Sequence, residues 1–238
     1  MVKKYKIDLH IHTCLSPCAD LTMLPTAIID EAEKRGLDCI GICDHNSSEN
    51  VAAVKRAGER TGVLVLGGME ITTREEVHIL SFFGEDDALH RIQELVYRNL
   101  PGENDETRFG EQLIIDEYDR IVGSCAKLLI GSTNLSVEET VQAIRDNGGI
   151  AVASHIDREQ FSILGQLGFI PEHLPLHALE LSPRADALKK DSFKNLGYPL
   201  VTFSDAHFLT EIGKTSTTVF ARELSFSALK TALCNMTP

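Results

Sequence analysis

Two histidines near the N-terminus are the first residues whose types and spacing could do chemistry. His10 and His12 stand two positions apart at the end of residues 5–12, where apolar and polar residues alternate. In a β-strand, residues i and i+2 point to the same face, so the two imidazoles would project together. Such a pair at a strand end can bind one metal ion, although two polar residues on a solvated face would show the same pattern.

Residues with the same chemistry recur where further strands are expected to end. They are Asp44-His45 after 38–43, Glu70 at the end of 63–70, His78 within 76–83, His155 after 150–154, and Asp205 and His207 after 199–204. In barrels of parallel strands, the functional site is built where the strands reach their C-terminal ends. The pattern therefore predicts a metal site with histidine and carboxylate ligands at that end of a sheet or barrel.

The rest of the sequence predicts the elements that would position these residues. Helices are expected over 22–35, 49–60, 86–98, 136–146 and 225–234, and further strands over 178–182 and 216–220. Ser136 and Glu139 have the spacing of a capping box at the start of one helix. Strands that alternate with helices favour a parallel sheet or barrel.

The chain has the organisation of one domain, predicted over residues 1–238. It contains no internal repeat and no linker long enough to separate two domains. Residues 100–133 are less regular than the rest, because Pro101-Gly102 opens a polar and charged stretch. We interpret this segment as an insertion or a lid.

Composition and charge exclude several classes of partner. The chain carries 23 Lys and Arg against 35 Asp and Glu, a formal net charge of −12. Nonspecific binding to nucleic acid or to anionic membranes needs a basic surface, and stacking on bases needs aromatic residues, which make up 6% here. An extended nucleic-acid track and a membrane partner are therefore not expected. Because the N-terminus lacks the hydrophobic core of a secretory signal, we expect a cytoplasmic protein with reduced thiols.

The motifs taken together resemble those of the PHP (polymerase and histidinol phosphatase) family of metal-dependent phosphoesterases. The matching segments are Asp8-Leu9-His10-Ile11-His12-Thr13, Asp20, Asp44-His45, Gly68-Met69-Glu70, Val77-His78, Ser154-His155 and Ser204-Asp205-Ala206-His207. The resemblance implies an α/β fold, a distorted seven-stranded (β/α) barrel of PHP type. It also implies a trinuclear metal centre at the C-terminal strand ends.

The resemblance further implies which residues bind the ions. The implied ligand sets are His10, His12, Glu70 and Asp205 for one ion; Glu70, His78 and His155 for a second; and Asp20, His45 and His207 for a third. Every expected position holds an expected residue type. Three divalent ions are thus implied, and nitrogen and oxygen ligands of this kind suit Mn, Zn or Fe.

Such a centre would hydrolyse phosphate esters. Two adjacent ions can share a hydroxide and lower its pKa, which makes a metal-bridging nucleophile at neutral pH. On this interpretation Glu70, Asp205 and His207 are catalytic. The expected substrate is a small phosphorylated metabolite, a nucleotide or a short oligonucleotide end. A 5′-end-directed exoribonuclease and a non-catalytic, metal-binding regulatory module are the alternatives.

Two arginines and one aspartate complete the candidates. Arg158 and Arg184 both follow predicted strand ends and could bind a substrate phosphate; the alternative for each is an exposed arginine without a functional role. Asp8 shares the strand alternation of His10 and could orient a ligand imidazole, or could be purely structural. Three histidines that match no motif are expected at the surface or in structural roles: His90, His173 and His177.

Overall fold

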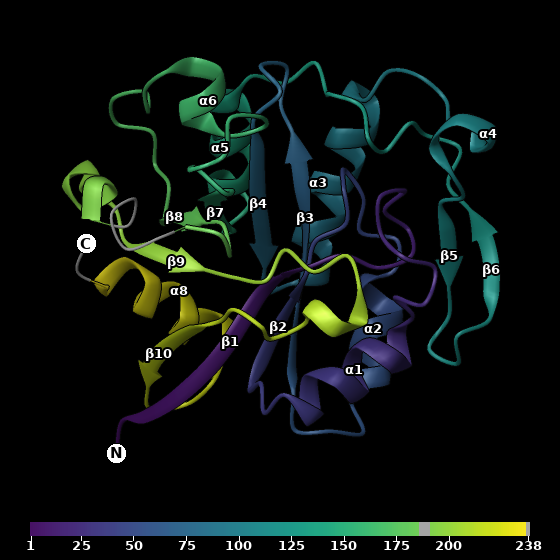
Figure 1. Ribbon diagram of the computed structural model, residues 1–238, viewed down its shortest axis with the longest axis horizontal. Helices are drawn as coiled ribbons and strands as arrows, with labels where there is room; N and C mark the ends of the chain where they lie inside the picture. Colours follow the sequence, from purple (N-terminus) through teal and green to yellow (C-terminus); the bar gives the residue numbers. More distant parts are fainter. Residues whose placement is uncertain (186–190, 237–238) are drawn as a thin grey trace.

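The computed structural model describes residues 1–185 and 191–236 and shows a mixed β-sheet that curves into a nearly closed barrel (Figure 1). The strands follow the order β10-β1-β2-β3-β4-β7-β8-β9. Their bounds are β1 (Lys3–Ile11), β2 (Cys39–Ile42), β3 (Leu64–Thr72), β4 (His78–Phe83), β7 (Ile150–Ala153), β8 (Ala178–Leu181), β9 (Leu200–Thr202) and β10 (Thr217–Ala221). Strand β10 pairs antiparallel with β1 and is an eighth strand, beyond the seven that the resemblance implies.

The five predicted helices lie close to their expected positions, and the described residues hold two short helices that were not predicted, over 106–109 and 163–167. The helices are α1 (Pro25–Lys34), α2 (Val51–Gly58), α3 (Asp86–Asn99), α4 (Glu106–Phe109), α5 (Val137–Asp146), α6 (Ile163–Leu167) and α8 (Phe226–Asn235), with short 3-10 helices at Lys194–Leu196 and Leu209–Glu211. The capping box of α5 is confirmed, since Ser136 Oγ accepts from the backbone N–H of Glu139, and Glu139 Oε2 accepts from the N–H of Ser136. No helix within the described ranges is long and apolar enough to cross a membrane.

Strand β4 runs antiparallel to both of its neighbours, which differs from the parallel sheet expected from the sequence. Residues 73–77 are too few for a helical crossover, so β3 and β4 form a hairpin. The strands on either side keep the parallel arrangement, from β1 to β3 and from β7 to β9. Because β4 is reversed, its first residue, His78, pairs with Thr72 and lies beside the end of β3.

The two edges of the sheet meet at a seam between β1, β9 and β10. Ile11 and Ala206 form a parallel bridge across this seam. Thr217 Oγ1, in β10, donates to the carbonyl of Thr202 in β9 and accepts from its backbone N–H. These bonds hold the segment after β9, which carries Asp205, against the end of β1.

Asp8 stabilises the same seam. The register of β1 against β2 shifts between Asp8 and Ile11, so an extra residue interrupts the strand alternation within this stretch. The Asp8 carboxylate accepts hydrogen bonds from the backbone N–H groups of Ser204 and Gly213, both at 2.9 Å. Burial raises the pKa of Asp8 to about 6. The structural interpretation of Asp8 therefore holds, and not the one in which it orients an imidazole.

Two apolar layers support the barrel. Inside it, Leu9, Phe82, Val152 and Phe203 pack together with α8, whose Leu229 is fully buried. Outside it, a larger apolar cluster joins the strands to α1, α2, α3 and α5. Full burial of one such side chain contributes about 1.5–3 kcal/mol. Because apolar side chains fill the interior, the polar residues gather at the end where β1, β2 and β3 finish.

Residues 100–133 contain α4 and a separate two-stranded sheet, β5 (Leu113–Ile115) with β6 (Ile121–Ser124), at the right edge of Figure 1. Asp119 accepts hydrogen bonds from the backbone N–H and hydroxyl of Thr26 in α1. Asn50 bonds to the backbone of Leu113 and Ile115. These contacts fasten the hairpin beside α1 and α2. The single-domain organisation and the lid remain predictions.

Candidate metal centre

The predicted histidines and carboxylates come together at one end of the barrel. His10 lies near the end of β1 with His12 just beyond it, His45 follows β2, Glu70 lies in β3 and His155 follows β7. His78 joins them because β4 is reversed, and Asp205 and His207 join them through the seam after β9. All except His207 are buried.

Glu70 lies at the middle of this group and is 1% exposed. The imidazole nitrogens nearest its carboxylate are His78 Nδ1 at 3.0 Å, His45 Nδ1 at 3.2 Å, His10 Nε2 at 3.4 Å, His155 Nε2 at 3.4 Å and His12 Nε2 at 3.5 Å. Burial alone would raise the pKa of Glu70, but the surrounding histidines hold it well below its usual value. An ionised carboxylate between two sets of imidazoles has the placement of a bridging ligand.

Asp205 forms a second acidic centre next to Glu70. Its Oδ1 lies 3.2 Å from His10 Nε2 and 3.4 Å from His12 Nε2. Burial would raise its pKa, yet these histidines hold it well below the usual value. The backbone of Asp205 has a φ of 50°, in the left-handed region that aspartate tolerates better than most residues. This conformation turns the chain sharply between Ser204 and His207.

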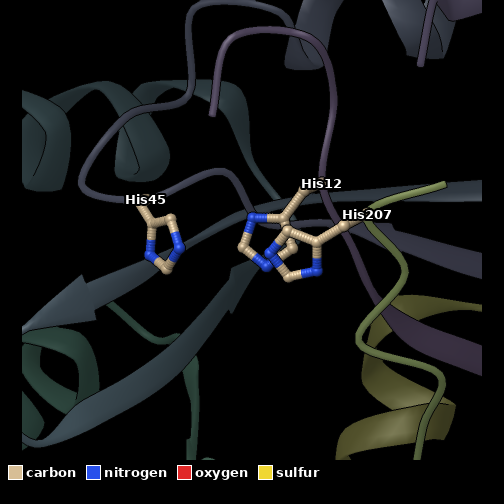
Figure 2. A group of neighbouring side chains, drawn as sticks. All are labelled: His12, His45 and His207. Carbon is tan, nitrogen blue, oxygen red and sulfur yellow. The ribbon is translucent and has the colours of Figure 1, made fainter. Parts of the chain in front are cut away.

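Three overlapping groups have ligand atoms close enough to share an ion, each within 4.8 Å of the others. They are His10, His12 and Asp205; His45, Glu70 and His78; and His12, His45 and His207. Figure 2 shows the last group, in which the His12 and His207 rings stack with centroids 4.3 Å apart. Burial and the neighbouring His207 lower the pKa of His12 to about 4, which keeps this imidazole neutral as a ligand must be.

The chemistry of these donors fits bound divalent ions. His45 Nδ1 faces Glu70 at 3.2 Å but without the geometry of a hydrogen bond, and buried polar atoms seldom remain unsatisfied. Mixed imidazole and carboxylate donors suit Zn, Mn and Fe. The three buried clusters are therefore consistent with a multinuclear metal site.

Hydrogen bonds behind the rings orient two of the histidines. His12 Nδ1 lies 3.0 Å from Ser16 Oγ, and this hydroxyl donates to Asp44 at 2.7 Å. His207 Nδ1 donates to the backbone carbonyl of Asp205 at 2.9 Å. Because Nδ1 carries the proton in both rings, their Nε2 lone pairs are free for an ion.

Asp20 is the one implied ligand that no described contact joins to the other ligand side chains. Its carboxylate accepts from the backbone N–H and hydroxyl of Thr22, and these bonds lower its pKa. Its backbone N–H donates to the carbonyl of His207 at 2.9 Å, which places Asp20 at the rim of the site. Its role as a ligand remains a prediction.

A cleft of about 650 Å³ opens over the histidines and carboxylates. Both predicted arginines line it, and Arg158 Nη2 donates to Asp205 Oδ2 at 2.5 Å. The apolar part of the wall includes Ile130 and Phe161, whose ring stacks on His78 with centroids 4.7 Å apart. The sequence reasoning missed Phe161, because nothing in the local pattern places an aromatic ring over a metal ligand.

The sequence reasoning also missed Glu180, in β8. Its carboxylate oxygens both lie 3.0 Å from His10 Nδ1, and the residue is fully buried. A signal was present, because Glu180 is the single charged residue in the apolar strand Ala178-Leu179-Glu180-Leu181. Charged residues are almost never fully buried unless they are paired, so an acid in a buried strand predicts a partner.

The three further histidines lie outside the centre. His90 is exposed on α3 beside Glu94, and His173 lies in the 171–175 stretch that follows α6. His177 is buried, and its Nδ1 accepts from the backbone N–H of Ala151. None of them belongs to the three groups with shared ligand geometry among the described residues.

Comparisons with known proteins agree with this geometry. The family model for the PHP domain matches residues 8–167. A phosphoribosyl 1,2-cyclic phosphate 1,2-diphosphodiesterase from Eggerthella lenta is 30% identical over 86 residues, which are 34% of this chain and 32% of the relative. This chain thus spans about a third of that relative's length.

Two solved structures share the fold. The lesion-specific endonuclease PfuEndoQ from Pyrococcus furiosus superposes with a TM-score of 0.71 and 16% identity, over 98% of this chain and 56% of the endonuclease. A structure from Bifidobacterium adolescentis, assigned as a metal-dependent phosphoesterase, gives a TM-score of 0.63 and 19% identity over 98% of this chain and 96% of its own. Because the PHP model matches more than half of the chain, this protein belongs to the PHP family of metal-dependent phosphoesterases.

Proposed function

We propose that this chain hydrolyses a phosphate ester of nucleotide size, either a nucleotide or a short oligonucleotide end. The observation that carries the proposal is the cleft of about 650 Å³, which is lined by members of each metal-ligand group, by two arginines and by an exposed aromatic ring. Pockets of about 300–1,000 Å³ are typical of small-molecule sites. Such a cleft offers one region for a phosphate and another for a planar or apolar group.

The positions of the ligand residues suggest which of them would hold each ion. His10, His12 and Asp205 would hold one ion, and His45, Glu70 and His78 another, with Glu70 between the two sets. When bound, the ions supply a water of lowered pKa and neutralise phosphoryl oxygens. His207 closes the third group, and its side chain is 22% exposed at the cleft.

Arg158 and Arg184 bind the phosphate on this proposal. The Arg158 guanidinium donates to Asp205 through Nη2, and this bond leaves its other N–H groups for a substrate. The arginine side chain is 43% exposed. It can therefore hold a phosphoryl oxygen without leaving the carboxylate. Arg184 is exposed in the same cleft and could bind a second phosphate or a nearby oxygen.

Phe161 would contact the base or another flat part of the substrate. One face of its ring stacks on His78, and the residue is 40% exposed. Base stacking on an aromatic ring contributes about 1–3 kcal/mol per base. The net charge of −12 opposes the binding of a long polyanion beyond the cleft, which limits the substrate to one or a few nucleotides.

The test compares substrates of different length on the metal-loaded protein. A nucleoside monophosphate, a nucleoside bisphosphate and a dinucleotide should be turned over better than RNA of roughly twenty nucleotides. Each is assayed at low and at raised salt. Faster turnover of the long RNA, with a steep loss on adding salt, would favour the 5′-end-directed exoribonuclease instead. Bound metal with no turnover of any phosphate ester would favour the regulatory module.

A further inference from the structure

Glu180 is a buried acid with no place in the ligand sets described above. It lies in β8, is fully buried, and approaches His10 Nδ1 with both carboxylate oxygens at 3.0 Å. Burying a charge costs several kcal/mol unless the charge is paired and hydrogen-bonded. Glu180 contacts a predicted metal ligand directly, so its burial needs an explanation.

The contacts of His10 place Glu180 behind the ring and not in the centre. On the opposite edge of the imidazole, Nε2 lies 3.2 Å from Asp205 Oδ1 and 3.4 Å from Glu70 Oε1. An ionised carboxylate only accepts hydrogen bonds, so Nδ1 of His10 must carry the proton. The lone pair of Nε2 then faces Asp205 and Glu70, where an ion would bind.

Two further donors fix the Glu180 carboxylate itself. The backbone N–H of His155 lies 3.2 Å from Oε2, and Ser154 Oγ lies 2.9 Å from the same oxygen. Ser154 Oγ also lies 3.0 Å from Glu70 Oε1, but its one proton serves one carboxylate at a time. Ions bound at Glu70 would occupy its lone pairs, so the hydroxyl would then donate to Glu180.

We propose that Glu180 is a positioning residue of the metal centre, which fixes the tautomer and orientation of His10 and strengthens the binding of the ion that His10 shares with His12 and Asp205. A carboxylate that accepts from the far nitrogen of a ligand histidine makes the imidazole a better donor to the ion. Loss of such a partner typically costs 10- to 100-fold in metal affinity. The inference rests on the proposed function only in that the centre binds metal.

The test is Glu180→Gln, which keeps the side-chain volume and removes the charge. An amide has one acceptor oxygen and cannot satisfy His10, Ser154 and the His155 N–H together. Competition between the protein and a chromophoric chelator for Zn²⁺, and separately for Mn²⁺, should show one ion bound about 10- to 100-fold more weakly. Glu94→Gln is the matched control, because Glu94 also lies beside a histidine, His90, but on the exposed face of α3.

A second variant separates charge from shape. Glu180→Asp keeps the charge and leaves a small void, whereas Glu180→Gln keeps the shape and loses the charge. If Glu180 acts through His10, metal affinity falls in the order wild type, Asp variant, Gln variant. Thermal unfolding of the metal-free proteins measures their stability, and the order of affinities should hold after differences in stability are taken into account. The reverse order, with the Gln variant closer to wild type, would show that Glu180 only packs the barrel.

The outcomes also distinguish this inference from the proposed function. Equal affinity for all ions in wild type and Glu180→Gln would overturn the positioning role and leave the phosphoesterase proposal intact. A wild-type protein that binds neither Zn²⁺ nor Mn²⁺ would overturn both. Should Glu180→Gln fail to fold, the Asp variant alone decides the matter, because unchanged affinity in that variant contradicts a role that depends on contact with His10.

Discussion

The Arg158 guanidinium donates a hydrogen bond to Asp205 Oδ2 across 2.5 Å, while Asp205 Oδ1 faces His10 and His12. One carboxylate therefore links the ligand histidines to a cation at the cleft surface. The arginine is held in place by the same residue that would hold an ion. On the proposed function, phosphate binding by Arg158 and metal binding would be joined at Asp205.

Replacing Arg158 with Gln should lower kcat/KM for a phosphate ester by about 10- to 100-fold, since a hydrogen bond to a charged group contributes about 1.5–3 kcal/mol. The loss should appear in KM alone if the guanidinium holds the phosphoryl group equally in the ground state and the transition state, and in kcat if the contact strengthens only in the transition state. Steady-state kinetics on the metal-saturated protein measure this. Arg91→Gln, at an exposed position on α3, serves as the control, and equal kinetics in both variants would remove Arg158 from the site.

Replacing Glu70 with Gln should reduce kcat at least about 100-fold while the barrel stays folded. Glu70 lies between the two sets of imidazoles, and a neutral amide bridges ions poorly, so the lowered pKa of water would be lost. Circular dichroism and elemental analysis accompany the assay. His90→Ala should be nearly silent in the same assay, and a fully active Glu70→Gln would show that Glu70 is not the bridge.

Elemental analysis of protein made with ample Mn or Zn should find close to three ions per chain. The ligand sets that the PHP resemblance implies provide for that number, and the structure shows three groups that share His12 and His45, as in a multinuclear site. Added metal should also raise the melting temperature, because a ligand at 100 times its Kd stabilises the folded state by about 2.7 kcal/mol. A chelator should reverse both effects. Active protein with one ion or none would contradict the trinuclear arrangement.

Protonation of His177 should make the folded protein less stable in mild acid. Burial, together with the charges of Arg145 and Lys230, lowers the pKa of His177 to about 4, whereas the unfolded chain protonates near 6.5. Between these values the unfolded state binds more protons, so stability falls as the pH falls from about 6.5 to about 4, by at most about 1.4 kcal/mol per pH unit. Urea unfolding at several pH values should show a shallower dependence for His177→Gln than for wild type. Parallel pH curves would contradict the assignment.

Local patterns in the sequence were enough to predict most elements and a shared site of histidines and carboxylates, although neither Phe161 nor Glu180 was predicted. The capping box at Ser136 and the spacing of His10 and His12 depend on residues within one turn or one strand, so no tertiary information is needed to recognise them. The recurrence of histidine and carboxylate residues after predicted strands indicated a shared site, because parallel strands end at the same edge. The resemblance to the PHP family then supplied the ligand residues. The structure brings all of them but Asp20 close together, in groups that differ from the implied sets, and the assignment of residues to individual ions stays a prediction.

Only the tertiary structure decided how distant segments pair. The reversal of β4, which brings His78 to Glu70, follows from the hairpin after β3 and its pairing with β7. The shift in register within β1, between Asp8 and Ile11, exists only against the neighbouring strand β2. Glu180 and His10 are separated by 170 positions in the sequence. Strand order and register depend on contacts between residues far apart in the chain, and no local periodicity encodes them.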